Sequence, residues 1–425
     1  MKRRAIIVGM LAASLAGLAL IFALIFWNGA TPSPGENHGP AETGGADAIP
    51  EVPGDEPRDE PADEPDPEPV PPGEPGSGIA TEGLLVAVGD IMMHMPQLPA
   101  YFDPESKRYD FTPFFAEVKP LIEDADWAMA NLETTLSADG DYTGFPRFSS
   151  PREIAEALKD AGFGIVTTAN NHALDRGVPG VERTIGFLEE LGLVTKGTSR
   201  SAEESARTVI VERNHIRIGV LAYTYGTNGI PIPADMPWLV DLIDEERIVR
   251  DIGALRDAGA DYIVIALHFG TEYQFMPNED QKGLARRLIA AGADLIAGSH
   301  PHVLQPYEVV EAQDENGSTR QGVIIYSMGN FISNQRGDTK EYGALYRIRL
   351  RKEEGATRMT EVEPVITWVH RYKADGRNHY RILPVGQTLE TRADPLLTAA
   401  DYAQLERNLE TLRKRLAAMG APLPD

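Results

Sequence analysis

The chain has 425 residues and no cysteine. It therefore forms no disulfide, offers no thiolate to a metal or a substrate, and has no cysteine for a lipid anchor. Basic character is also scarce: the formal net charge is −24, and no stripe of lysine and arginine with interleaved aromatic residues is present. These absences argue against thiolate metal sites, a cysteine nucleophile and nucleic-acid binding. A chain without cysteine also suits an oxidising exterior.

Long apolar runs are scarce as well, and the one that exists lies at the N-terminus. An uncharged stretch of 23 residues, 5–27, follows the basic residues 2–4 and ends in Trp27. As a helix it would be ~34 Å long, enough to cross a hydrocarbon core of ~30 Å, whereas the apolar region of a cleaved signal peptide has only ~7–15 residues. We therefore predict a cytoplasmic basic segment at 1–4 and an uncleaved transmembrane anchor at 5–27 rather than a cleaved signal. The remainder of this single-pass cell-membrane protein would be extracytoplasmic.

Residues 28–80 are rich in proline and acid. They contain 13 prolines, 13 acidic residues and one arginine, with the repeated unit Asp-Glu-Pro. Such a composition cannot bury a core, and charge repulsion together with polyproline character extends it. We predict a disordered linker that serves as a solvated stalk. The alternative is a segment that contacts wall polymers or cations.

From residue 81 onward, short apolar runs alternate with amphipathic stretches, which is typical of α/β folds with both sheet faces covered. We predict a folded domain over 81–370 and a C-terminal extension over 371–425, whose amphipathic helix begins at a capping box of Thr398 and Asp401. The leucines of that helix either pack on the domain or form a seam for self-association. A hairpin turn near 213–215 and two late strands, in ALYRIRLRK and EVEPVITWVH, indicate a mixed sheet system. The other predicted strands are 84–88, 127–130, 163–168, 262–267, 295–297 and 323–326, and the predicted helices are 152–161, 180–191, 245–258 and 280–291.

Polar residues follow each of these six strands. In a layered α/β fold, the carboxyl ends of the strands converge on one crevice. Taken singly, each polar residue has an ordinary structural explanation, such as a turn, a cap or a satisfied core histidine; the conjunction points to a site. The residues at the strand ends are Asp90, Asn131, Glu133, Asn170, Asn171, His172, His268, Glu272, Tyr273, His300, His302, Ser327 and Asn330.

Six of these residues form a candidate ligand set for metal ions. His300 and His302 lie two apart on an extended segment that Pro301 stiffens, so both imidazoles face one side. Carboxylate, carboxamide and imidazole ligands without sulfur suit Mn, Fe or Zn. Two such ions ~3.5–4 Å apart need a bridging carboxylate and about six protein ligands. The predicted ligands are Asp90, Glu133, Asn171, His268, His300 and His302.

The motifs GDIMMH, NLETTLS, NNHALDRG, HFGTEY, GSHPHVLQPYE and SMGNF occur in this order between about residues 84 and 335. In this the chain resembles the capsule-synthesis CapA family, also called poly-γ-glutamate biosynthesis proteins, which is similar to the calcineurin-like metallophosphoesterases. The resemblance implies a metallophosphatase-like four-layer αββα sandwich with a two-metal site, here preceded by the transmembrane helix and the disordered stalk. It also implies a role in the biosynthesis or export of a capsule or of poly-γ-glutamate.

The resemblance also divides the ligands between two ions, with Glu133 as the bridge. Two features depart from the phosphoesterase pattern. The first strand lacks Asp-x-His, since the nearest histidine, His94, comes four residues after Asp90, and the bridging residue is Glu rather than Asp. The implied first set is Asp90, Glu133 and His302, and the implied second set is Glu133, Asn171, His268 and His300. Candidates for substrate binding or for supporting the ligands are His94, Asn131, Asn170, Glu272, Tyr273 and Asn330.

The run NNHALDRG suggests where proton transfer would take place. Asn171 offers its amide oxygen to a metal, while His172 points elsewhere and suits a general acid or a donor to developing charge. Asp175 would orient the imidazole if a helix begins there, and Asn170 would tie the loop together. The alternative is that these residues only cap the next helix.

Three functions fit this sequence. The first is an extracytoplasmic metal-dependent hydrolase or transferase acting on an anionic polymer or a phosphoester. The second is a non-catalytic accessory subunit that works with membrane subunits of a surface-polymer synthase. The third is a module that holds an anionic polymer through bridging cations. His172 beside Asn171 favours chemistry, because a purely structural metal site does not need it.

Overall fold

The computed structural model describes residues 80–313, 317 and 319–421. The predicted segment 1–4, the predicted anchor 5–27 and all but the last residue of the predicted linker 28–80 lie outside the described residues. Among the helices of the described part, none is long and apolar enough to cross a membrane.

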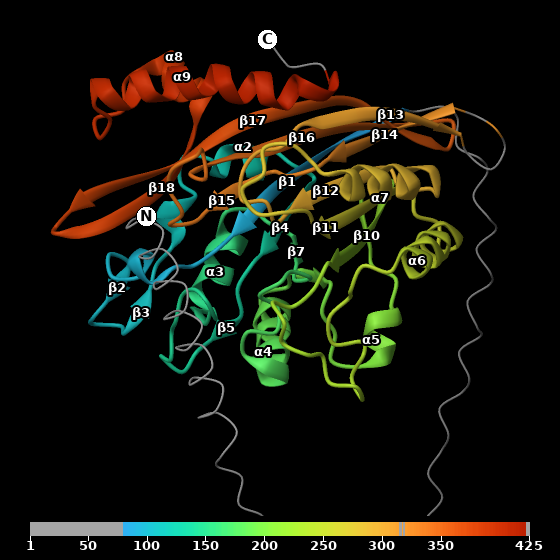
Figure 1. Ribbon diagram of the computed structural model, residues 1–425, viewed down its shortest axis with the longest axis horizontal. Helices are drawn as coiled ribbons and strands as arrows, with labels where there is room; N and C mark the ends of the chain where they lie inside the picture. The colour runs from blue at the N-terminus through green and yellow to red at the C-terminus, as the bar shows by residue number, and fades with distance from the viewer. Residues whose placement is uncertain (1–79, 314–316, 318, 422–425) are drawn as a thin grey trace, which may run out of the picture. The chain divides into compact units, whose positions relative to one another are not determined.

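Two large β sheets form the centre of the fold (Figure 1). The first sheet has the order β18 (Arg377–Pro384), β17 (Ala356–Ala374), β16 (Tyr342–Glu353), β1 (Thr81–Ile91), β4 (Trp127–Leu132), β7 (Ile165–Thr167) and β8 (Val194–Lys196), with β15 (Asn330–Ile332) beside β1. The second has the order β13 (Tyr307–Gln313), β14 (Thr319–Ile325), β12 (Leu295–Ser299), β11 (Tyr262–His268), β10 (Ile216–Thr224) and β9 (Ile210–Arg213). In the first sheet, strands β18 to β1 pair antiparallel and strands β1 to β8 pair parallel; in the second, the parallel pairs lie in the middle and an antiparallel pair at each end. The predicted mixed α/β fold is therefore confirmed.

The two sheets pack face to face, with helices on both outer faces. Alternate residues of a strand point to opposite sides, so Leu85 of β1 packs against the second sheet while Leu84 packs beneath the helices. The helices on the outer face of the first sheet are α2 (Lys119–Glu123), α3 (Glu153–Asp160) and α4 (Gly177–Glu190), and those on the second are α6 (Glu245–Asp257) and α7 (Glu279–Ala290). Shorter elements are β2 (Phe102–Asp103), β3 (Arg108–Tyr109), β5 (Leu136–Ser137), β6 (Ser150–Pro151) and α5 (Ala202–Ala206).

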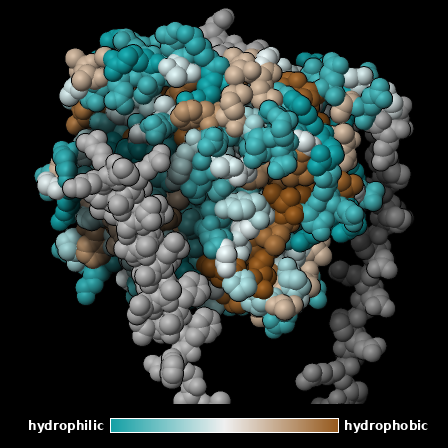
Figure 2. Space-filling model, in the orientation of Figure 1, coloured by the Kyte–Doolittle hydropathy of each residue, from teal (hydrophilic) through white to brown (hydrophobic). Residues whose placement is uncertain are grey.

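Local sequence signals explain several element boundaries. The hairpin between β9 and β10 turns at Asn214 and His215, both with positive φ, where the sequence predicts a turn. A capping box of Asn278 with Gln281 starts α7. Figure 2 shows that the visible surface is mostly hydrophilic, with a band of hydrophobic residues across part of it. Most large apolar side chains are therefore in the cores.

The C-terminal part of the chain continues the first sheet. The predicted boundary between 370 and 371 falls inside β17, and β18 pairs with β17 along its length. Two helices follow, α8 (Val385–Thr391) and α9 (Ala399–Leu416), and α9 begins at the predicted capping box of Thr398 and Asp401. In Figure 1, α9 runs above β17 at the top of the view.

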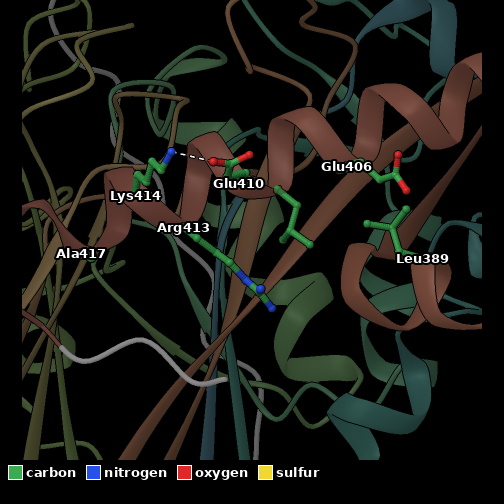
Figure 3. A pocket seen from close by; sticks show the side chains of 7 residues that line it. Leu389, Glu406, Glu410, Arg413, Lys414 and Ala417 are labelled. Carbon is green, nitrogen blue, oxygen red and sulfur yellow. Dashed lines mark hydrogen bonds and ion pairs between the residues drawn. The ribbon is translucent and has the colours of Figure 1, made fainter.

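The leucines of α9 pack mainly on the domain, as one of the two interpretations of their spacing expects. Leu405, Leu412 and Leu416 are fully buried with residues of β16 and β17. Leu409 is only partly buried and lines a shallow surface groove between α8 and α9 (Figure 3). None of the candidate metal ligands lines this groove.

The parallel pairing of β1 with β15 positions the first candidate ligand, Asp90. Asp90 pairs in register with Asn330 of β15 and with Asn131 of β4. The preceding residue must be glycine, because a Cβ on Gly89 would lie 2.0 Å from the carbonyl oxygen of Gly329. This close approach holds the end of β1 against β15, so that Asp90 is completely buried at the meeting point of the strands.

Candidate metal centre

The candidate ligands lie together at the carboxyl ends of strands from both sheets. Asp90 is the penultimate residue of β1, and His268 ends β11. Glu133 follows β4, Asn171 follows β7, and His300 and His302 follow β12. All six are buried, with at most 4% of each residue exposed. The fold therefore brings six residues into one polar cluster inside the protein, although the first and the last of them are 212 positions apart in the sequence.

Short contacts connect the six side chains. The closest are Asp90 Oδ2 to His302 Nδ1 at 3.0 Å and Asn171 Oδ1 to His268 Nε2 at 3.1 Å. Glu133 Oε1 lies 3.6 Å from Nε2 of both His268 and His302. The backbone N–H of His300 donates to Asp90 Oδ2 at 3.4 Å. Glu133 thus lies between the imidazoles of the second sheet, as a bridging carboxylate would.

Two separate groups of three side chains each offer ligand atoms within 4.8 Å of one another. This grouping differs from the one implied by the family resemblance. His268 is grouped with Asp90 and Glu133, although His302 also lies 3.0 Å from Asp90 Oδ2 and 3.6 Å from Glu133 Oε1, as the resemblance implies. The second group includes Glu272, which the sequence suggested only as a supporting or substrate-binding residue. The first group is Asp90, Glu133 and His268, and the second is Glu272, His300 and His302.

The electrostatics of the cluster are unfavourable for the protein alone. Burial, together with the neighbouring Asp90 carboxylate, raises the pKa of Glu133 well above its ordinary value. Burial and the neighbouring His300 lower the pKa of His268, and burial lowers the pKa of His300 to about 3, with His302 contributing. The two histidines are therefore neutral at pH 7, which is the form that binds metals.

Buried polar atoms without partners show whether the cluster fits a cation. Both carboxylate oxygens of Glu133 are buried without a hydrogen-bond donor among the described residues, and so is Nδ1 of His300. A buried carboxylate without a partner is costly. A divalent cation would satisfy both carboxylates and the ring nitrogens at once, and the sulfur-free donor set suits a borderline or hard metal. The residues present therefore fit a divalent cation.

The backbone around the second group is strained. His300 has φ 99°, His302 has φ 56° and Tyr273 has φ 65°, a region that non-glycine residues rarely adopt. The backbone N–H of Tyr273 donates to the carbonyl of Pro301 at 2.8 Å, which ties the Glu272 loop to the histidine segment. Strain of this kind is usually kept where it places functional side chains.

His172 lies beside the cluster and has its own partner. Its Nδ1 is 2.7 Å from Asp175 Oδ2, and the same Asp175 oxygen accepts the backbone N–H of Phe148 at 2.6 Å. The ring of Phe148 packs edge-on against His172, with centroids 4.7 Å apart. Asp175 thus holds the imidazole as predicted, although α4 begins only at Gly177 and the contact is made within a turn.

Six supporting residues were predicted: Glu272 belongs to the second group, three others lie against the cluster, and two lie apart from it. Asn131 donates to Asp90 Oδ1 at 2.9 Å, and Asn330 Oδ1 lies 3.2 Å from His302 Nδ1. Asn170 ties the loop to β4 by donating to the carbonyl of Leu132 and to Asn131 Oδ1. The ring of Tyr273 lies near His302, with centroids 6.1 Å apart. His94 is instead turned to the backbone N–H of Asn334, which it accepts at 3.4 Å.

Two residues at the centre were missed in the sequence. Ser299 Oγ lies 2.9 Å from His268 Nδ1, so it can fix the imidazole from behind. Tyr225 accepts a hydrogen bond from Asn171 at 3.4 Å, and its ring lies 4.6 Å from that of His300. Both could have been found by the rule that identified the ligands, because Ser299 ends β12 and Tyr225 directly follows β10.

Comparison with known proteins adds the following. Residues 84–335 match the family described as "Bacterial capsule synthesis protein PGA_cap". The "PGA biosynthesis protein CapA" of Bacillus subtilis (strain 168) is 30% identical over 292 residues, covering 65% of this chain and 70% of that protein. A "Probable polyglutamine synthesis accessory protein" of Mycobacterium tuberculosis (strain CDC 1551 / Oshkosh) is 25% identical, covering 50% of this chain and 57% of that protein.

A solved structure has also been compared with this chain. The "calcineurin-like phosphoesterase YfkN from Bacillus subtilis" is similar with a TM-score of 0.39 and 16% sequence identity. The similarity covers 79% of this chain and 100% of that one.

Proposed function

The chain belongs to the bacterial capsule synthesis protein family, and from that premise we propose that it is a metal-dependent hydrolase or transferase. Its substrate would be an anionic polymer or a phosphoester of the cell envelope, in the biosynthesis or export of a capsule or of poly-γ-glutamate. The name of its Bacillus subtilis relative supports the process. The buried polar cluster supports the chemistry.

One observation carries the proposal of chemistry. Glu133 is fully buried, has no hydrogen-bond donor among the described residues, and lies beside a second carboxylate, Asp90. Two acids and three imidazoles would cost stability there without a compensating ligand. A divalent metal centre, with two ions of Mn, Fe or Zn as the proposed content, gives this arrangement a use.

The residues of the chain would divide the work as follows. Bound divalent ions would supply a Lewis acid and lower the pKa of a water molecule. Asp90, Glu133 and His268 would hold one ion and Glu272, His300 and His302 another, with Asn171 close to the first. His172 would donate a proton to the leaving group or to developing charge, while Asp175 fixes its ring. The hydroxyl of Tyr225, which is partly exposed, is also available to a substrate.

A metal analysis tests this proposal. The purified chain, reconstituted with Mn, Fe or Zn, is expected to retain about two divalent ions, and the double variant His300→Ala with His302→Ala is expected to retain fewer. Hydrolysis of a panel of phosphoesters and γ-glutamyl peptides should be lost on chelation and return with metal. Failure of the parent protein to bind metal under any of these conditions would contradict the proposed metal centre.

A second candidate, an accessory subunit without chemistry, is favoured by the printed name of the Mycobacterium tuberculosis relative. In that case the cluster would bind metal for structure, and membrane subunits of a synthase would carry out polymer synthesis. The two proposals differ in whether His172 is needed, because it is not among the grouped ligands.

We also propose that residues 5–27 anchor the chain in the cell membrane and that the metal centre faces the exterior. The support is the sequence alone, 23 uncharged residues after three basic ones. The protein is expected in the membrane fraction, with its C-terminal domain open to external protease. Recovery of a soluble form that begins near residue 30 would show that the segment is cleaved instead.

A further inference from the structure

A short loop after β15 is hydrogen-bonded to Asn330, which lies beside the candidate ligand His302. Asn330, which contacts His302, also donates to Gln335 Oε1 at 3.0 Å and to the carbonyl of Lys340 at 2.8 Å. Gln335 in turn donates to the hydroxyl of Tyr273 at 3.5 Å, although this contact is long. The loop 333–340 is therefore fastened directly to a residue that touches a candidate ligand.

Arg336 in this loop is a largely buried cation with spare donors. Its Nη1 donates to the carbonyl of Gln335 at 3.2 Å, whereas its buried Nη2 has no hydrogen-bond partner among the described residues. Its guanidinium lies over the ring of Tyr380, 5.7 Å from the centroid. Burial lowers the pKa of Arg336 to about 10, with Arg371 contributing, yet the group remains charged at pH 7.

Arg371 provides a second cation beside it. Arg371 on β17 is paired in register with Tyr380 on β18, and it donates to Asn334 Oδ1 at 3.3 Å. Tyr380 donates to the same oxygen at 2.7 Å, so Asn334 links Arg371 to the tyrosine whose ring lies beneath Arg336. The nearest acid to influence Arg336 is Glu341, whose carboxylate accepts the backbone N–H of Gly337.

Neither arginine has an ion-pair partner. Within the described residues, no carboxylate oxygen lies within 4.0 Å of a guanidinium nitrogen of Arg336 or Arg371. Two arginines that influence each other, neither in an ion pair and one with a buried unused donor, can receive an anion.

We propose that Arg336 and Arg371 form a subsite that binds an oxyanion of the substrate, a carboxylate or a phosphate, beside the metal centre. A planar guanidinium binds either group through two parallel hydrogen bonds. The cation pair would draw an acidic substrate into an otherwise acidic domain. The subsite would hold the substrate next to the reacting group and would take no part in proton transfer. The use of the bound anion rests on the function proposed above.

Binding of defined anions to the full-length chain tests the subsite. A γ-linked glutamate oligomer and inorganic phosphate are titrated separately by calorimetry, in the presence of a chelator so that no turnover occurs. Because a charge-assisted hydrogen bond is removed, Arg336→Gln is expected to weaken binding of at least one probe roughly 10- to 100-fold. Loss for the oligomer identifies a carboxylate subsite, and loss for phosphate alone identifies a phosphate subsite.

Two further variants make the result interpretable. Arg371→Gln changes an exposed side chain, so it tests the same subsite if Arg336→Gln fails to fold. Arg413→Gln makes the same change in charge on α9, in the groove of Figure 3 away from the candidate ligands, and should bind as the parent does. Unchanged affinity for both probes in Arg336→Gln and Arg371→Gln would overturn the subsite, even if the chain hydrolyses its substrate. If binding depends on the arginines but the metal-loaded chain hydrolyses no substrate, the subsite is supported and the proposed reaction is overturned.

Discussion

Replacing His172 by alanine is expected to lower turnover by roughly 10²–10⁴-fold while the metal content and the fold are retained. His172 is hydrogen-bonded to Asp175 rather than to a grouped metal ligand, so its loss removes a proton donor and leaves the ligand set intact. Since the imidazole acts only in the transition state, kcat should fall while KM changes little. The measurement is steady-state kinetics on whichever substrate of the panel is hydrolysed, together with metal analysis of the same sample.

The matched control for His172→Ala is His215→Ala. His215 lies in the exposed turn between β9 and β10, so this variant should match the parent in rate and metal content. In cells, the His172→Ala protein should be present at the normal level but fail to support polymer formation. Normal polymer in that strain, in contrast to a deletion strain, would favour the accessory-subunit proposal.

Replacing Glu133 by glutamine is expected to have opposite effects on the metal-free and the metal-loaded protein. Without metal, the variant should be more stable than the parent at pH 7.5 by about 1–3 kcal/mol, because an uncompensated buried acid has been removed. With excess divalent metal, the parent should gain about 2.7 kcal/mol at 100 times its Kd, and the variant should gain little. Urea unfolding with chelator and with metal measures both effects.

The pH dependence of the metal-free protein follows from the same carboxyl group. The pKa of Glu133 is raised in the folded state, so above the ordinary value near 4.3 the folded chain holds a proton that the unfolded chain has released. The contribution of Glu133 to the free energy of unfolding therefore declines as pH rises from about 4.3 towards the raised pKa. Glu133→Gln should remove this decline, and the exposed control Glu410→Gln should keep it. Two results together would contradict the role of Glu133 as a metal ligand: lower stability of Glu133→Gln than of the parent in chelator, and unchanged metal binding by the variant.

The sequence predicted the strands and their polar ends well because two signals coincide there. An apolar run such as 262–267 can only be a buried strand in this pattern, and β11 occupies Tyr262–His268. A polar residue directly after such a run lies at the end of the strand, and this position does not depend on how the other elements are arranged. Asp90, Glu133 and His268 were therefore placed from the sequence, and the structure brings them together.

Residues in irregular segments were harder to place. Glu272 lies four positions after β11, and its approach to the histidines depends on the positive φ of Tyr273 and a bond to Pro301. No periodic pattern in the sequence reports such a turn. Arg336 was missed for a similar reason. Its proposed role in anion binding depends on Arg371 and Tyr380, which lie on β17 and β18 in a later part of the chain. The pairing of the two strands is visible only in the folded protein.

The position of β1 in the middle of its sheet has a consequence for when the protein can fold during synthesis. All candidate metal ligands precede residue 303, but β1 pairs along most of its length with β16, and Thr81 faces Lys352. Contacts so far apart in sequence are slow to close. Until residues 342–353 emerge, the edge of β1 that pairs with β16 keeps its backbone N–H and C=O groups unpaired, and a nascent chain in this state is prone to aggregate. The segment that completes the sheet therefore comes after the part that matches the family, 84–335, and the ligands reach their final arrangement only after that segment has been synthesised.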